Sequence, residues 1–191
     1  MLSLQNLRSL SLDSWDEREL LPPLGKLPFL EELSVSYMEK VKTVGDEFLG
    51  ITGTQTSSSS SSSSSVLFPK LKQLTFHGMW EWKQWEGVGG RTENGGDEIT
   101  IMPCLVSLRI EYCRQLMNLP LFLQKTPVRN VEIRKCRRSI RMPVWPENCE
   151  VEIFQDEEDP VIPDVSESDE TEIESDEEIT TTSCGWKALC G

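Results

Sequence analysis

Residues 105–120 read LVSLRIEYCRQLMNLP, and counted from Leu105 they carry apolar residues at positions 1, 4, 6, 9, 12 and 15. The same spacing recurs, in full or shortened form, in residues 71–85 (LKQLTFHGMWEWKQW), 30–44 (LEELSVSYMEKVKTV), 128–136 (VRNVEIRKC) and 4–12 (LQNLRSLSL). A final, shortened copy follows at residues 151–153 (VEI). Chance does not produce so many copies of one spacing, so the chain contains an internal repeat.

Each copy contains an apolar-polar-apolar triplet, which predicts a short β-strand with both apolar side chains on one face. The flanking period-three positions are typical of turns and 3-10 segments. One such unit cannot bury its apolar edge alone, so neighbouring units are expected to stack and join their strands into a parallel sheet. The polar residues at the strand centres should then face outward: Ser11, Ser34, Thr75, Arg109, Glu132 and Glu152.

The strand centres lie 23, 41, 34, 23 and 20 residues apart. Spacings of 20–23 match a leucine-rich repeat, whose period is about 20–29 residues. The longer spacings indicate loop insertions near 50–65 and 86–98, where serine, glycine and polar residues dominate. The predicted fold class is therefore α/β, a leucine-rich-repeat solenoid over residues 1–155 with one short parallel strand per repeat and an irregular, 3-10-rich convex side.

The charge of the chain is concentrated in its C-terminal segment. The formal net charge is −13, but residues 156–191 hold 13 acids and one base, whereas residues 1–155 hold 19 acids and 18 bases. Such an acidic, weakly hydrophobic segment is expected to be disordered. A net-acidic chain is also a poor candidate for nucleic-acid binding. No apolar run reaches the length of about 18 residues that a membrane span requires.

No residue pattern predicts catalysis, a metal site or a cofactor site. The chain has a single histidine, His77, which is expected to be an exposed strand residue, and its six cysteines form no CxxC pair. Cys113 and Cys136 occupy the slot three residues after the second apolar strand position, together with Trp15, Met38 and Met79, and are interpreted as buried structural thiols. Trp82 and Trp85 occupy repeat core positions, whereas Trp80 is out of register and expected to be partly exposed.

Three longer stretches carry a family resemblance: residues 24–50 (LGKLPFLEELSVSYMEKVKTVGDEFLG), 67–85 (LFPKLKQLTFHGMWEWKQW) and 102–120 (MPCLVSLRIEYCRQLMNLP). They resemble the distal leucine-rich repeats of plant intracellular immune receptors of the coiled-coil, nucleotide-binding, leucine-rich-repeat type. The resemblance implies a cytoplasmic role in sensing pathogen effectors and in restraining the receptor. The chain contains no GxxxxGK[ST] loop, so nucleotide binding is not transferred to it. It also starts in mid-pattern, which leads us to expect a C-terminal fragment or a truncated product.

Repeat solenoids bind partners on the concave sheet face, through side chains that do not pack inside. On this basis the predicted partner-binding residues are Tyr37, His77, Arg109, Glu111, Tyr112, Glu132, Arg134 and Lys135. Tyrosine and arginine are favoured as interface anchors. The alternative is that the charged members form a cross-strand lattice on a solvated face, and neither interpretation excludes the other.

A basic cluster follows the fifth strand, at residues 134–141 (RKCRRSIR). It can act as a contact to an upstream domain or to the acidic tail, as a simple solvated patch, or as a nuclear-import or nucleic-acid patch.

The sequence favours a non-catalytic module that recognises proteins. The expected partners are a pathogen effector, a guarded host protein or the nucleotide-binding domain of the receptor itself. The alternative is another leucine-rich-repeat recognition or scaffold protein, such as a substrate-selecting ubiquitin-ligase subunit. An enzyme is disfavoured because no paired acid and base, metal-ligand set or phosphate loop is present in the sequence.

Overall fold

The computed structural model describes residues 6–14, 18–51, 65–87 and 99–155. All of them belong to one compact unit, Met1–Asp159. Most of the two predicted loop insertions, the predicted disordered tail at 156–191 and the slot residue Trp15 lie outside the described residues.

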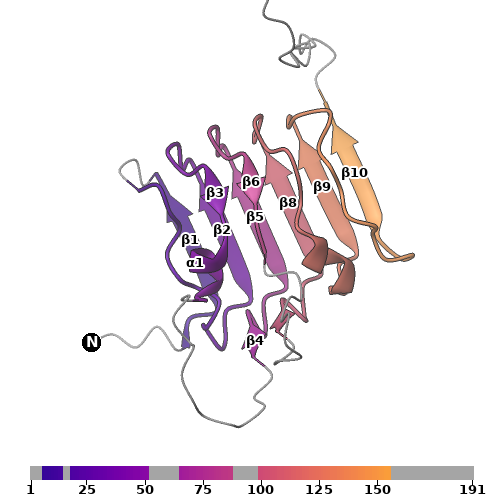
Figure 1. The fold of residues 1–191 in the computed structure, drawn as a ribbon. Coiled ribbons are helices and arrows are strands. Elements are labelled where there is room, and N and C mark those ends of the chain that lie inside the picture. Colours follow the sequence, from indigo (N-terminus) through magenta and orange to yellow (C-terminus); the bar gives the residue numbers. More distant parts are fainter. Residues whose placement is uncertain (1–5, 15–17, 52–64, 88–98, 156–191) are drawn as a thin grey trace, which may run out of the picture. The chain divides into compact units, whose positions relative to one another are not determined.

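The main sheet has six strands, all parallel, whose order in space is their order in the sequence (Figure 1). Its strands are β1 (Ser9–Asp13), β2 (Glu32–Ser36), β5 (Gln73–His77), β8 (Ser107–Glu111), β9 (Asn130–Arg134) and β10 (Glu150–Phe154). Each copy of the sequence pattern therefore supplies one strand. The predicted register is confirmed, because the six polar strand centres pair with one another across the whole sheet.

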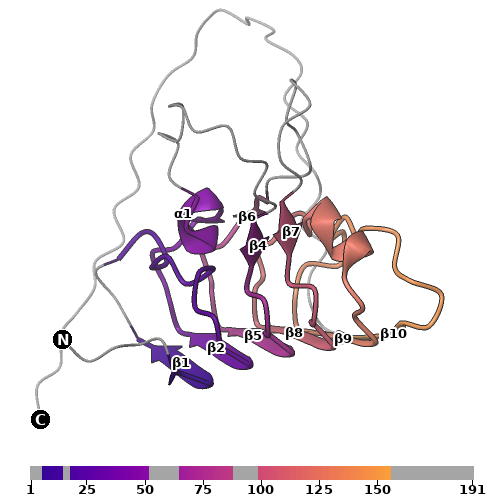
Figure 2. The ribbon, with the colours of Figure 1, turned by 90° about the horizontal axis from the view of Figure 1, so that it is seen from below.

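Short elements lie across the core from the main sheet (Figure 2). They are the parallel pair β3 (Thr43–Val44) and β6 (Gln84–Trp85), the parallel pair β4 (Val66–Leu67) and β7 (Thr100–Ile101), the helix α1 (Asp46–Leu49) and the 3-10 helix η2 (Leu121–Lys125). The sequence analysis predicted irregular and 3-10 structure here and did not predict the two strand pairs. These pairs form because equivalent segments of successive copies run side by side, so that their backbone groups can bond across copies.

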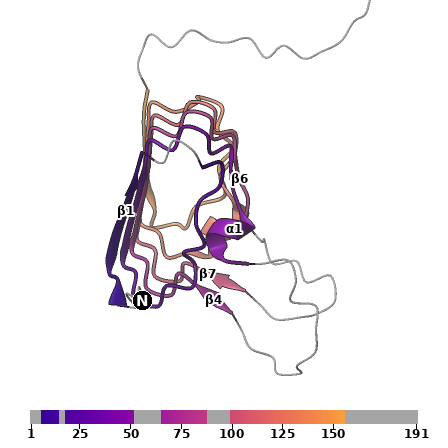
Figure 3. The ribbon, with the colours of Figure 1, turned by 90° about the vertical axis from the view of Figure 1, so that its left-hand side faces the viewer.

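The fold is thus α/β, with a parallel sheet and few helical residues. Viewed along the sheet, successive copies follow closely similar paths around the core (Figure 3), an arrangement that is compatible with a repeat fold. In the part of the chain that the structure describes, no helix is both long enough and apolar enough to cross a membrane.

The core lies between the main sheet and the short elements. Cys113 and Cys136 are buried, as predicted, and so are Met38 and Met79 at the same slot of their copies. The two tryptophans at repeat positions, Trp82 and Trp85, are buried in a cluster of aromatic rings that also holds Phe76 and Phe122. Trp80 is 45% exposed, so its interpretation as an out-of-register residue is confirmed.

The two outermost strands are covered less completely than the sequence pattern suggested. In β1, Leu10 and Leu12 are only partly buried. In β10, Val151 is partly buried and Ile153 is 49% exposed. Ile153 still lies on the inward face of the sheet, since it pairs with the buried Ile133. Among the described residues, each outer strand of the sheet pairs with a strand on one side only, so its apolar side chains are covered from one side.

Candidate binding surface on the main sheet

One face of the main sheet is turned away from the core, and we call it the outer face. It consists of the first, third and fifth residues of the six strands, because the second and fourth residues are the apolar ones packed inside. Strand register sorts these side chains into rows. The last row, at the C-terminal ends of the strands, contains Asp13, Ser36, His77, Glu111, Arg134 and Phe154.

In the main sheet, the residue that directly follows β1, β2, β5, β8 or β9 adopts a left-handed backbone conformation. Tyr37, Tyr112 and Lys135 have φ of 54°, 56° and 51°, a conformation that residues other than glycine rarely adopt. It is held in place because each amide donates to the carbonyl at the end of the next strand: Tyr37 to His77 O at 2.9 Å, Tyr112 to Arg134 O at 2.9 Å. Repetition of this turn places Tyr37, Tyr112 and Lys135 at equivalent positions along the edge of the outer face.

Aromatic rings form a continuous row along this edge. The ring centroids of Tyr37 and His77 lie 5.1 Å apart, those of His77 and Tyr112 also 5.1 Å, and Trp80 adds a fourth ring 6.5 Å from Tyr37. Gly78 occupies the equivalent left-handed position of its own copy, with φ of 64°. A Cβ atom there would lie 2.9 Å from Cδ1 of Tyr37, so glycine leaves the room that the tyrosine ring occupies.

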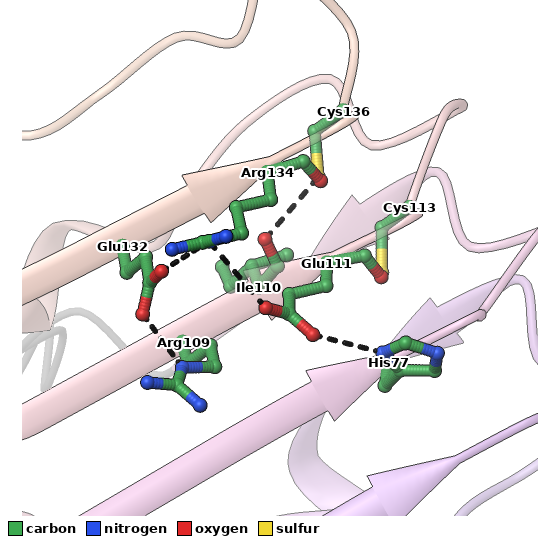
Figure 4. Close-up of polar contacts among 8 residues, drawn as sticks. All are labelled: His77, Arg109, Ile110, Glu111, Cys113, Glu132, Arg134 and Cys136. Carbon is green, nitrogen blue, oxygen red and sulfur yellow. Dashed lines mark hydrogen bonds and ion pairs between the residues drawn. The ribbon is translucent and has the colours of Figure 1, made fainter. Parts of the chain in front are cut away.

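Five of the predicted residues form a single polar network across three strands (Figure 4). Nδ1 of His77 lies 3.0 Å from Oε2 of Glu111, and the second oxygen of Glu111 lies 3.7 Å from Nε of Arg134. Arg134 also donates to Glu132, which accepts a further hydrogen bond from Nε of Arg109 at 2.7 Å. The predicted charge lattice therefore exists.

The network alternates in sign and is open to solvent on its cationic side. The side chains of Arg109 and Arg134 are 52% and 46% exposed, whereas those of Glu132 and Glu111 are 17% and 19% exposed. Each exposed ion pair is worth about 0–1 kcal/mol of stability. The network therefore contributes little to the stability of the fold. Its main effect is to orient the side chains of Arg109 and Arg134 on the outer face.

A shallow hollow of about 300 Å³ opens at the C-terminal ends of β8, β9 and β10. Its lining consists of His77, Glu111, Tyr112, Arg134, Lys135, Phe154 and Gln155. The guanidinium of Arg134 stands 4.4 Å from the centroid of the Phe154 ring, and Nζ of Lys135 stands 5.2 Å from that of Tyr112. Such cation–π contacts hold both cations at the rim of the hollow.

Two buried thiols lie beneath this part of the surface. Sγ of Cys113 donates to the carbonyl of Glu111 at 3.3 Å, and Sγ of Cys136 donates to the carbonyl of Arg134 at 3.2 Å. Burial raises the pKa of the Cys113 thiol well above its usual value. This cysteine is therefore a structural support for the strand end and a poor nucleophile. Among the described residues, no group of three or more His, Cys, Asp or Glu side chains could hold a metal ion.

All eight predicted residues lie on or beside the outer face, and seven of them, with Phe154, come together near the hollow or in the network attached to it. Tyr37 lies apart from the hollow and connects to it through His77. The sequence analysis missed Phe154 and Gln155. Phe154 follows the shortened copy at 151–153 by one position, as Arg134 follows its own triplet, so the repeat register carried the signal. Whether these residues bind a partner stays a prediction.

Comparison with known proteins adds one similarity. The chain is 33% identical over 109 residues to "Putative disease resistance protein At3g14460" from Arabidopsis thaliana. The matched stretch covers 56% of this chain. This match relates the chain to a plant disease resistance protein. The chain spans only 6% of the length of that relative. No protein-family model matches the chain, and no solved structure matches it.

Proposed function

We propose that the chain is the leucine-rich-repeat solenoid of a plant disease resistance protein of the nucleotide-binding type, and that its outer face recognises another protein. Two observations support the repeat assignment: the six sequence copies align residue for residue in the parallel sheet, and the chain is similar to a plant disease resistance protein. We further propose that the chain acts in plant defence, in the cytoplasm, as a recognition module that is not itself an enzyme.

The observation that carries the recognition role is the clustering of interface-type residues on the outer face. Tyr37 is 42% exposed, and Arg109 and Arg134 expose about half of their side chains while their guanidinium groups are oriented by Glu132. Tyrosine, tryptophan and arginine dominate the binding energy of protein interfaces, and an oriented side chain loses less entropy on binding. A surface of this composition fits a protein partner with both acidic and apolar groups. We propose a pathogen effector, a guarded host protein or the nucleotide-binding domain of the receptor as that partner.

A comparative binding experiment tests this proposal. The full chain is immobilised as wild type, as the outer-face variant Tyr112→Ala with Arg109→Ala, and as the control variant Leu121→Ala. Leu121 is 68% exposed in η2, on the side opposite the main sheet, so its loss should not touch the outer face. Proteins retained from infected plant tissue are quantified by mass spectrometry, and a candidate is then purified and titrated by calorimetry.

The expected result is a partner that the wild type and the control variant bind equally. The outer-face variant should raise its Kd by about 30-fold, which corresponds to one interface hot spot. If every partner binds the outer-face variant as tightly as the wild type, or if the control variant alone loses binding, recognition by the outer face is refuted.

A further inference from the structure

The hollow at the ends of β8, β9 and β10 lies where the described chain leaves the sheet. Gln155, the last described residue, is part of its lining. The next four residues are Asp156, Glu157, Glu158 and Asp159, so four consecutive acids begin at the rim of a hollow that carries Arg134 and Lys135.

The distribution of charge along the chain favours a contact between the acidic segment and the hollow. The described residues from 99 to 155 hold nine bases and five acids, whereas those from 6 to 87 hold eight bases and nine acids. The segment 156–191 holds 13 acids and one base. The positive part of the described chain is therefore the part from which the acidic segment departs, and opposite charges attract most strongly at this short range.

The lining also suits carboxylates in detail. Glu111 of the lining and Glu132 beside it both lie against Arg134, so the charges of these three side chains partly compensate one another. The guanidinium of Arg134 lies over the Phe154 ring and Nζ of Lys135 lies over the Tyr112 ring, so both cations belong to the rim of the hollow. Glu152, in the central row of β10, is the nearest exposed acid on that strand and lies one row away from Phe154. The proposed contact therefore depends on the cations of Lys135 and of the half-exposed Arg134, acting against the charges of Glu111 and Glu132.

The covalent connection makes the contact local. The amide of Lys135 donates to the carbonyl of Phe154 at 2.8 Å, which fixes the end of β10 beside the two cations. Four residues reach at most about 14 Å from that point, enough to cross the hollow and too little to reach distant surfaces. A tether of this length produces an effective concentration on the order of millimolar, so even weak ion pairs become populated.

We propose that the acidic segment 156–159 docks in the hollow of its own chain, against Arg134 and Lys135, and covers the C-terminal part of the outer face. The docking is inferred from the charges at the hollow and from the position of Gln155 in its lining. Its consequence, competition with a protein partner for the outer face, rests on the proposed function.

Nuclear magnetic resonance of the full ¹⁵N-labelled chain tests the docking. One variant neutralises the proximal acids (Asp156→Asn, Glu157→Gln, Glu158→Gln, Asp159→Asn). The matched control neutralises four distal acids of the same segment (Glu172→Gln, Glu174→Gln, Asp176→Asn, Glu177→Gln). A third variant, Lys135→Gln, removes one cation from the rim and leaves the segment unchanged. Amide shifts and heteronuclear NOEs are recorded at low and at high salt.

Docking predicts that the proximal variant shifts the amides of Tyr112, Lys135 and Phe154, and that high salt produces the same shifts in the wild type. It also predicts that Lys135→Gln lowers the NOE values of residues 156–159. The distal variant should do neither. Equal shifts in both neutralised variants, no shifts in either, or shifts that grow with protein concentration and so report contact between copies, each overturn docking within one chain. Loss of partner binding in the outer-face variant together with an undocked segment leaves the proposed function standing and removes this inference alone.

Discussion

Replacement of Trp82 by alanine tests whether this tryptophan is part of the core. The Trp82 side chain is fully buried, with ring centroids 4.7 Å from Phe76 and 5.6 Å from Trp85. Its Nε1 donates a 2.8 Å hydrogen bond to the carbonyl of Gln84, at the start of β6. The substitution therefore opens a cavity, breaks two ring contacts and removes a donor from a backbone carbonyl.

The size of the effect follows from these losses. Truncation of a buried tryptophan to alanine costs about 3–5 kcal/mol, and a typical hydrogen bond contributes about 1 kcal/mol within such a value. We expect Trp82→Ala to lower the free energy of unfolding by about 4 kcal/mol. A domain of this size has a total stability of about 5–15 kcal/mol, and its Tm should fall by about 8–16 °C.

Urea denaturation of both proteins, followed by far-ultraviolet circular dichroism, measures the change without relying on tryptophan emission. Trp80→Ala is the matched control, since Trp80 is 45% exposed and its ring lies 6.5 Å from that of Tyr37. It should cost less than about 1 kcal/mol, as surface substitutions usually do. Equal destabilisation by the two substitutions, or a larger effect of Trp80→Ala, would refute the assignment of Trp82 to the core.

Three further predictions address the thiols, the acid sensitivity and the turn glycine. Iodoacetamide at neutral pH should modify the exposed Cys104 in the native chain and leave Cys113 unmodified until urea is added, as peptide mapping will show, because burial both covers that thiol and raises its pKa. Glu31 accepts a 2.7 Å hydrogen bond from Lys72, which lowers the pKa of its carboxyl below 4.5; the resulting stabilisation is present above that pH and lost as the pH falls through the lowered pKa. The urea midpoints of wild type and Glu31→Gln should therefore differ at neutral pH and converge in acid, and a constant difference would contradict this. Gly78→Ala should cost about 1–3 kcal/mol and shift the ring resonances of the tyrosine that lies over it, since its φ is 64° and the new Cβ meets that ring; unchanged ring resonances would contradict the packing.

Much of the fold could be predicted because the information is local. An apolar-polar-apolar triplet such as Leu108 to Ile110 determines which side chains face inward, whatever lies beside it. Since every copy has the same triplet, the pairing of Arg109 with Thr75 and Glu132 followed from counting. The exposure of Ile153 could not be counted in this way, because it depends on whether another strand covers β10.

The sequence predicted which residues lie on the candidate surface. It did not predict which of their side chains contact one another. His77 and Glu111 are 34 residues apart in the chain, and nothing in either copy states that their side chains meet at 3.0 Å. The same holds for Phe154, whose role under Arg134 depends on how two neighbouring strands are packed.

The sequence by itself thus determined the repeat, the strand register, the inward and outward faces and the separation of an acidic segment from a nearly neutral remainder, because spacing and charge are properties of the chain. Only the tertiary structure decided which outward side chains bond to one another, where the left-handed turns place Tyr37 and Tyr112, and that a hollow opens at the point where the acids begin. These features arise from side-by-side packing of neighbouring copies, which the spacing of residues along the chain does not specify.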